Sequence, residues 1–86
     1  MEMKPGSLVR SKAGHDKGEL LCVVGLEEKT VWVCDGRQRP LNRPKKKNPK
    51  HLGLLPLTLS AEEMQNDRRL RKTLFKLKSE TQNQGG

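Results

Sequence analysis

Residues 9–26, which read VRSKAGHDKGELLCVVGL, decide the fold of this 86-residue chain. The second half, residues 19–26, is apolar at successive positions, so the strand that it predicts must be covered on both faces. Such a strand suits a small closed barrel that has another element packed against its outside. Gly25 interrupts the apolar run and predicts a bend or a bulge where the strand curls.

The first half of the stretch predicts a short strand and then a tight, basic loop. Gly14 and Gly18 bracket this loop, and glycine can adopt the positive-φ conformations that a tight loop requires. Lys12, His15 and Lys17 should project from the loop while its ends are held in a sheet. Because two of them are cationic and the third is a histidine, these three side chains are candidate contacts for a polyanion, RNA being one candidate.

The remainder of residues 1–42 extends this β module. Further strands are expected at 30–35 and 37–42, joined by Asp35-Gly36, a signal for a type I′ hairpin turn. Pro40 would confine the last strand to an edge of the sheet. Four or five short strands in so short a segment predict a mainly β fold, a small SH3-like barrel rather than a sandwich.

The alternation of side chains along these strands identifies the expected core. Trp32 should point away from that core, either as a cover under the C-terminal segment or, alternatively, as a base-stacking platform. The residues expected to fill the barrel are Val9, Ala13, Leu21, Val23, Val31, Val33 and Leu41.

Basic residues are concentrated directly after this module. The chain has 18 Lys and Arg against 10 Asp and Glu, a net charge of +8, and residues 43–51 alone contribute five bases and no acid. Pro44 and Pro49 keep this basic strap extended, and an extended cationic segment suits a phosphate backbone. The alternative is a solvated charge run that only maintains solubility. The candidate RNA-binding residues of the strap are Arg43, Lys45, Lys46, Lys47, Lys50 and His51.

The C-terminal part predicts a linker, a helix and a tail. Residues 52–59 are an apolar linker that should lie on the outer face of the barrel. A capping box at Ser60 and Glu63 predicts a helix over 60–78, and residues 79–86 form a polar tail that we expect to be disordered. The stripe of Leu70, Leu74 and Leu77 should dock the helix on the barrel. A basic cluster in the helix adds four candidate RNA-binding residues, which are Arg68, Arg69, Arg71 and Lys72.

Composition argues against catalysis, metal binding and membrane insertion. Only 31% of the residues are hydrophobic and two are aromatic, so a deep apolar pocket is not expected. Asp16 is better interpreted as a loop-stabilising side chain than as a catalytic partner of His15. Cys22 and Cys34 lack the spacing of a zinc site and predict reduced core thiols. We therefore expect a cytoplasmic protein without enzymatic activity, cofactor or membrane segment.

Residues 6–52 resemble a family of small bacterial KOW-domain RNA-binding proteins. That family is in turn similar to a KOW-domain protein of the archaeal and eukaryotic large ribosomal subunit. The resemblance rests on GSLVRSKAGHDKG at 6–18, the Asp35-Gly36 turn and RPKKKNPKHL at 43–52. It implies an SH3-like barrel and association with RNA or ribosomes. His15 stands where the family commonly has an arginine, and no family role transfers to the helix.

These observations predict a non-enzymatic RNA-binding protein, monomeric when free, that associates with ribosomal RNA or the large ribosomal subunit. The alternative is a KOW protein-interaction module of a transcription or translation complex. Duplex DNA binding by charge alone is a third hypothesis. Membrane binding is disfavoured, because the basic strap has no apolar face carrying aromatic residues.

Overall fold

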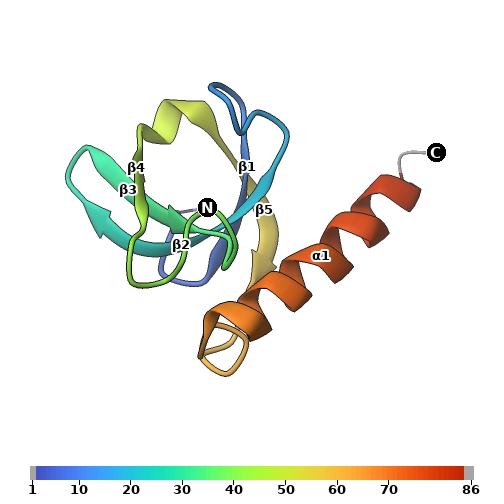
Figure 1. Ribbon diagram of the computed structural model, residues 1–86. Helices are drawn as coiled ribbons and strands as arrows, with labels where there is room; N and C mark the ends of the chain where they lie inside the picture. Colours follow the sequence, from blue (N-terminus) through green and yellow to red (C-terminus); the bar gives the residue numbers. More distant parts are fainter. Residues whose placement is uncertain (1, 85–86) are drawn as a thin grey trace.

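The computed structural model of the protein describes residues 2–84 (Figure 1). It is mainly β, with one antiparallel sheet of five strands followed by a single C-terminal helix. No helix within the described residues is long and apolar enough to cross a membrane. The elements are β1 (Ser7–Ser11), β2 (Leu20–Glu27), β3 (Thr30–Cys34), β4 (Lys45–Lys47), the 3₁₀ helix η1 (Pro49–His51), β5 (Leu52–Thr58) and α1 (Asp67–Gln84).

The sheet has the strand order β4-β3-β2-β1-β5 and is strongly curled (Figure 1). Strands β4 and β5 are its two edges, so the hydrogen-bonded ladder does not close into a complete barrel. A shift of register between Val23 and Gly25 in the β2–β3 pairing confirms the bulge predicted at Gly25. Gly25 lies opposite Trp32 there, and the Trp32 side chain is in van der Waals contact with the position of a Cβ on Gly25, at 3.5 Å.

Strand β2 is covered on both faces, as its sequence predicts. Leu21 and Val23 belong to a cluster on one face of the sheet, together with Val9, Val31, Val33 and Leu52. Leu20 and Cys22 point to the other face and join a second cluster. That second cluster also contains residues from β1, β3, α1 and the segment directly after β5, namely Leu8, Cys34, Leu70, Leu74 and Leu59.

Helix α1 closes the second cluster through its leucine stripe. Leu70 is fully buried, Leu74 is 6% exposed, and Leu77 packs at the margin of the same cluster. The predicted docking of the stripe is therefore confirmed, with Leu55 as its partner on β5. Leu54 packs on the opposite cluster instead, and Leu57 is 41% exposed.

Two sequence predictions about the middle of the chain are wrong. Residues 37–42 form no strand, because the Asp35 carboxylate accepts hydrogen bonds from the backbone amides of Arg37 and Arg39, which folds the chain into a loop. Residues 52–58 are not a linker but strand β5, which pairs antiparallel with β1. Pro56 is tolerated there because β5 is an edge strand.

The helix also begins and ends later than predicted. Ser60 and Glu63 do exchange the two hydrogen bonds of a capping box, at 2.9 and 3.2 Å, but only turns follow them. The helix starts at Asp67, where the Asn66 side chain accepts a hydrogen bond from the Arg69 amide. Residues 79–84, predicted as part of a disordered tail, continue α1, and residues 85–86 lie outside the described part of the chain.

Two residues assigned to the barrel core behave differently from the other five. Leu41 is half-buried and packs against the second cluster, which α1 covers. Ala13 is half-buried in the loop after β1. Neither residue is part of a strand, so neither side chain points into the interior of the curled sheet.

Candidate nucleic-acid interface

The loop at residues 12–18, between β1 and β2, is closed by backbone hydrogen bonds at its base. The Gly18 amide donates to the Ser11 carbonyl at 2.8 Å, and the Ser11 amide donates to the Glu19 carbonyl at 3.0 Å. Gly14 and Gly18 both have a φ of +90°, so the predicted need for glycine at these positions is confirmed. Lys12, His15 and Lys17 are exposed on this loop.

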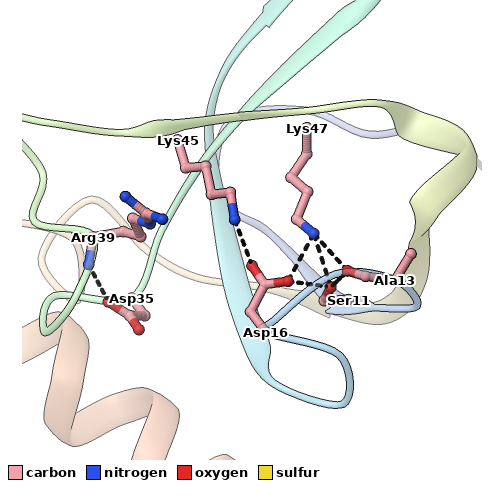
Figure 2. Close-up of polar contacts among 7 residues, drawn as sticks. All are labelled: Ser11, Ala13, Asp16, Asp35, Arg39, Lys45 and Lys47. Carbon is pink, nitrogen blue, oxygen red and sulfur yellow. Dashed lines mark hydrogen bonds and ion pairs between the residues drawn. The ribbon is translucent and has the colours of Figure 1, made fainter.

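Asp16 joins this loop to the basic strap, as Figure 2 shows. Its carboxylate accepts a hydrogen bond from the Ser11 hydroxyl at 2.8 Å and from the Lys47 ammonium at 2.7 Å. The Lys45 ammonium lies 3.6 Å from the other carboxylate oxygen. Sequence analysis interpreted Asp16 as a loop-stabilising side chain, and its partners are the Ser11 hydroxyl of the loop and two strap lysines.

The surroundings of Asp16 favour its charged form. Burial alone would raise the pKa of this carboxyl group, but the hydrogen bonds from Lys47 and Ser11 and the charges of Lys47 and Lys45 lower the pKa to about 2. The carboxylate is therefore ionised throughout the neutral range. It compensates the charge of Lys47 inside the fold.

Lys47 is a structural residue in this arrangement. It is 8% exposed, and its ammonium group donates to Ser11, Ala13 and Asp16 at 3.0, 2.9 and 2.7 Å (Figure 2). An ammonium group has three donors, so all of them are used within the protein. No donor of Lys47 remains for a phosphate, and we remove it from the candidate RNA-binding residues.

The neighbouring Lys46 points to the opposite face of β4, as strand alternation requires. Its ammonium group lies 5.1 Å from the centre of the Trp32 ring, and the Trp32 indole donates to the Glu27 carboxylate at 3.2 Å. Trp32 is half-buried by these strand neighbours, and it belongs to neither apolar cluster. The predicted cover of Trp32 by the C-terminal segment is therefore wrong.

A second loop, at residues 35–39, is fixed against the first turn of α1. The Asp67 carboxylate accepts a hydrogen bond from the Leu41 amide at 2.7 Å. Gly36, with a φ of +76°, lies so close to the helix that a Cβ there would contact the Asp67 carbonyl and lie 3.0 Å from the Arg71 amide. This close approach holds Arg37 and Arg39 beside α1.

The two loops, β4 and α1 together surround a cleft of about 280 Å³, which we call the basic cleft. Its cationic side chains come from segments far apart in the sequence, and its lining includes His15 of the first loop. The lysine and arginine residues that line it are Arg37, Arg39, Lys45, Arg71 and Lys78.

Three acids also line the basic cleft, and each has a partner within the protein. Asp16 pairs with Lys45 and Lys47, while the Asp35 carboxylate accepts the two backbone amides of its own loop. Glu19 forms an ion pair with Lys78 at 3.3 Å. By contrast, three exposed arginines of the cleft make no ion pair within residues 2–84, and these are Arg37, Arg39 and Arg71.

Phe75 adds an aromatic surface to the basic cleft. Phe75 is the chain's only phenylalanine, and its side chain is 73% exposed. It lines the cleft one helical turn after Arg71. Arg71, Phe75 and Lys78 are spaced by four and three residues, so they share one flank of α1. This flank borders the buried leucine stripe and faces the loops.

The remaining predicted residues are exposed but lie outside the lining of the basic cleft. On the loop side, the Lys12 amide donates to the His51 carbonyl at 2.8 Å, which places the first loop next to η1. On α1, Arg69 forms an ion pair with Glu62 at 2.9 Å. The exposed candidates outside the lining are Lys12, Lys17, Arg43, Lys46, Lys50, His51, Arg68, Arg69 and Lys72.

Sequence analysis therefore identified three members of the basic cleft, His15, Lys45 and Arg71, and missed Arg37, Arg39 and Phe75. Residues 37–42 were interpreted as a strand, which hid the two arginines. The spacing of Phe75 four residues after Arg71 was a usable signal, because it places an aromatic ring on the basic flank of the predicted helix.

No known protein-family model matches this chain, and a search of the curated proteins finds no relative. The chemistry of the basic cleft must therefore be derived from its own residues.

Within residues 2–84, the His, Cys, Asp and Glu side chains form no cluster able to hold a metal ion. Burial raises the pKa of Cys22 to about 12 and that of Cys34 to about 11, with further contributions from nearby acidic groups.

Proposed function

We propose that this protein is a non-enzymatic RNA-binding protein and that the basic cleft is its RNA site. The observation that carries the proposal is the convergence of Arg37, Arg39 and Arg71 around one cleft, none of them in an ion pair within the described residues. Guanidinium groups bind phosphate in a planar, bidentate manner, and arginine remains charged at any physiological pH.

The hydrogen bonds and close contacts that hold the two loops support this proposal. The first loop is closed by backbone hydrogen bonds and by Asp16, and the second is fixed to α1 by Gly36 and Asp67. Loops held in this way present their side chains with little loss of conformational entropy on binding. Solvated charge runs, which only maintain solubility, do not need such fixed geometry.

The proposal includes the KOW resemblance and an SH3-like fold. It is supported by the basic loop between β1 and β2, by the pairing of β1 with both β2 and β5, and by the 3₁₀ helix between β4 and β5. The RNA expected from the resemblance is ribosomal RNA, within the large subunit. The buried free thiols Cys22 and Cys34 suit a reducing compartment such as the cytoplasm.

Fluorescence anisotropy with a labelled 12-nucleotide RNA at several salt concentrations tests the RNA site. The double variant Arg37→Ala/Arg39→Ala should weaken binding and reduce the magnitude of the slope of log K against log salt by about 1.4, since each lost phosphate contact removes about 0.7 on a single strand. The control is Lys4→Ala/Lys29→Ala, which removes two exposed charges that do not line the cleft.

The control variant should keep an affinity near that of the unaltered protein. Equal losses in the two double variants would show that binding depends on net charge alone, and the assignment of the basic cleft would be wrong. If the unaltered protein and the variants all failed to bind the RNA, the RNA-binding function itself would be contradicted. A protein partner whose affinity does not depend on salt concentration would favour the protein-interaction alternative.

A further inference from the structure

The exposed ring of Phe75 is the feature of the basic cleft that phosphate binding does not use. Among the side chains that the structure describes, the other large apolar ones that exceed 40% exposure are Leu26 and Leu57, which are aliphatic and lie outside the cleft. Phe75 is 73% exposed, lies beside the arginine cluster and is held on a helix whose leucine stripe is buried. An aromatic ring fixed next to phosphate-binding groups is suited to stack on a nucleobase.

Stacking on Phe75 requires a base whose face is free. In an RNA duplex each base is stacked between its neighbours, and a protein reaches only backbone, 2′-hydroxyl groups and base edges. Bases in single strands, loops and strand ends can turn outward and stack on an aromatic side chain. The cleft has a volume of about 280 Å³, just below the range of about 300–1,000 Å³ for ligand pockets, so it suits one nucleotide rather than a duplex.

We infer that the basic cleft binds an unpaired nucleotide, with its base stacked on Phe75 and an adjacent phosphate held by Arg71 and the loop arginines. Arg71 precedes Phe75 by four residues, a rise of about 6 Å along the helix axis, so one face of α1 presents both groups to the same nucleotide. This inference rests on the proposed RNA-binding function and specifies its substrate class as single-stranded RNA or an RNA loop or end.

The test compares Phe75→Ala and Phe75→Tyr in binding to a 12-nucleotide single strand and to a duplex of the same length at one salt concentration. Phe75→Ala should weaken single-strand binding about 5- to 140-fold, which is the range for loss of one stacked base. Its affinity for the duplex should change less than about twofold, because the base faces there are covered. Phe75→Tyr keeps the ring and should restore single-strand affinity.

Leu26→Ala is the matched control, since it shortens an exposed apolar side chain that does not line the basic cleft. A direct readout comes from Phe75→Trp, whose added indole fluorescence should be quenched by the single strand beyond any change seen with Trp32 alone in the unaltered protein. The ring of Phe75 is largely exposed, so none of the three substitutions of Phe75 should unfold the protein.

The outcomes separate this inference from the proposed function. Unchanged single-strand affinity in Phe75→Ala, combined with weakened binding in Arg37→Ala/Arg39→Ala, would overturn the stacking inference and leave the RNA site intact. Equal losses for single strand and duplex in Phe75→Ala would also overturn it, because the ring would then act without stacking. If neither Phe75→Ala nor Arg37→Ala/Arg39→Ala weakened binding, the stacking inference and the RNA site would both be overturned.

Discussion

At the scale of the residue, Lys46 and Lys47 are adjacent in β4 but have opposite roles. Lys47→Met leaves the Asp16 carboxylate with fewer partners and should lower the free energy of unfolding by about 2–3 kcal/mol. Lys46→Met removes only an exposed cation–π contact and should cost less than about 1 kcal/mol. Urea unfolding followed by circular dichroism measures both; equal costs would contradict a structural role for Lys47.

Asp16 predicts a pH dependence of stability. Its pKa is about 2 in the folded protein, below the ordinary value of 3.8, so its stabilising contribution is present above about pH 4 and is lost as the pH falls towards 2. Asp16→Asn should therefore be less stable than the unaltered protein between about pH 5 and 7, and the difference should shrink below pH 4. A stability difference that stayed constant down to pH 2 would show that this carboxylate contributes nothing through its charge.

At the scale of the element, the contact between the 35–39 loop and α1 shapes the basic cleft. Gly36→Ala would place a methyl group against the Asp67 carbonyl, so it should lower both stability and RNA affinity. Gly18→Ala is the control, because Gly18 also has a positive φ, +90°, but nothing lies within 4 Å of a Cβ there. Gly18→Ala should lower the free energy of unfolding only by the strain of a left-handed backbone conformation, about 1–2 kcal/mol.

Thermal unfolding and RNA anisotropy of these two glycine variants separate strain from steric contact. The expected result is a larger loss of stability and a clear loss of affinity in Gly36→Ala alone. Similar effects on affinity in both variants would contradict the importance of the loop–helix contact.

The elements also show what sequence can and cannot predict here. The run at 19–26 predicts a strand covered on both faces because burial leaves a local apolar pattern, and the leucine stripe predicts the docked face of α1 for the same reason. Strand β5 and the start of α1 were missed because they depend on tertiary partners. Pairing with β1 converts residues 52–58 into a strand. Asp67 anchors the helix start through a hydrogen bond to the distant Leu41 amide, which local patterns do not contain, whereas Asn66 is a local N-cap that the capping box at Ser60 and Glu63 obscured.

The same reasoning applies to the site. Charge density drew attention to the strap, but charge alone does not distinguish the buried Lys47 from the exposed Lys46. That distinction requires the fold to bring Asp16 beneath β4 (Figure 2). The two arginines of the second loop join the cleft only because Gly36 allows that loop to approach α1.

At the scale of the whole molecule, the proposed association with ribosomes predicts a specific sedimentation behaviour. In a sucrose gradient of native cell lysate the protein should migrate with large ribosomal subunits, and a high-salt wash should release it, because phosphate contacts weaken as salt rises. Arg37→Ala/Arg39→Ala should be released at lower salt. Migration at the top of the gradient under all conditions would contradict stable ribosome binding.

The central claim is that RNA enters the basic cleft, and nuclear magnetic resonance tests it most directly. Titrating ¹⁵N-labelled protein with a short single-stranded RNA should shift the backbone amide signals of His15, Arg37, Arg39 and Phe75. The amides of the β2–β3 turn, such as Lys29, should remain unchanged. Shifts confined to the β5 edge or spread evenly over the basic residues would contradict the claim.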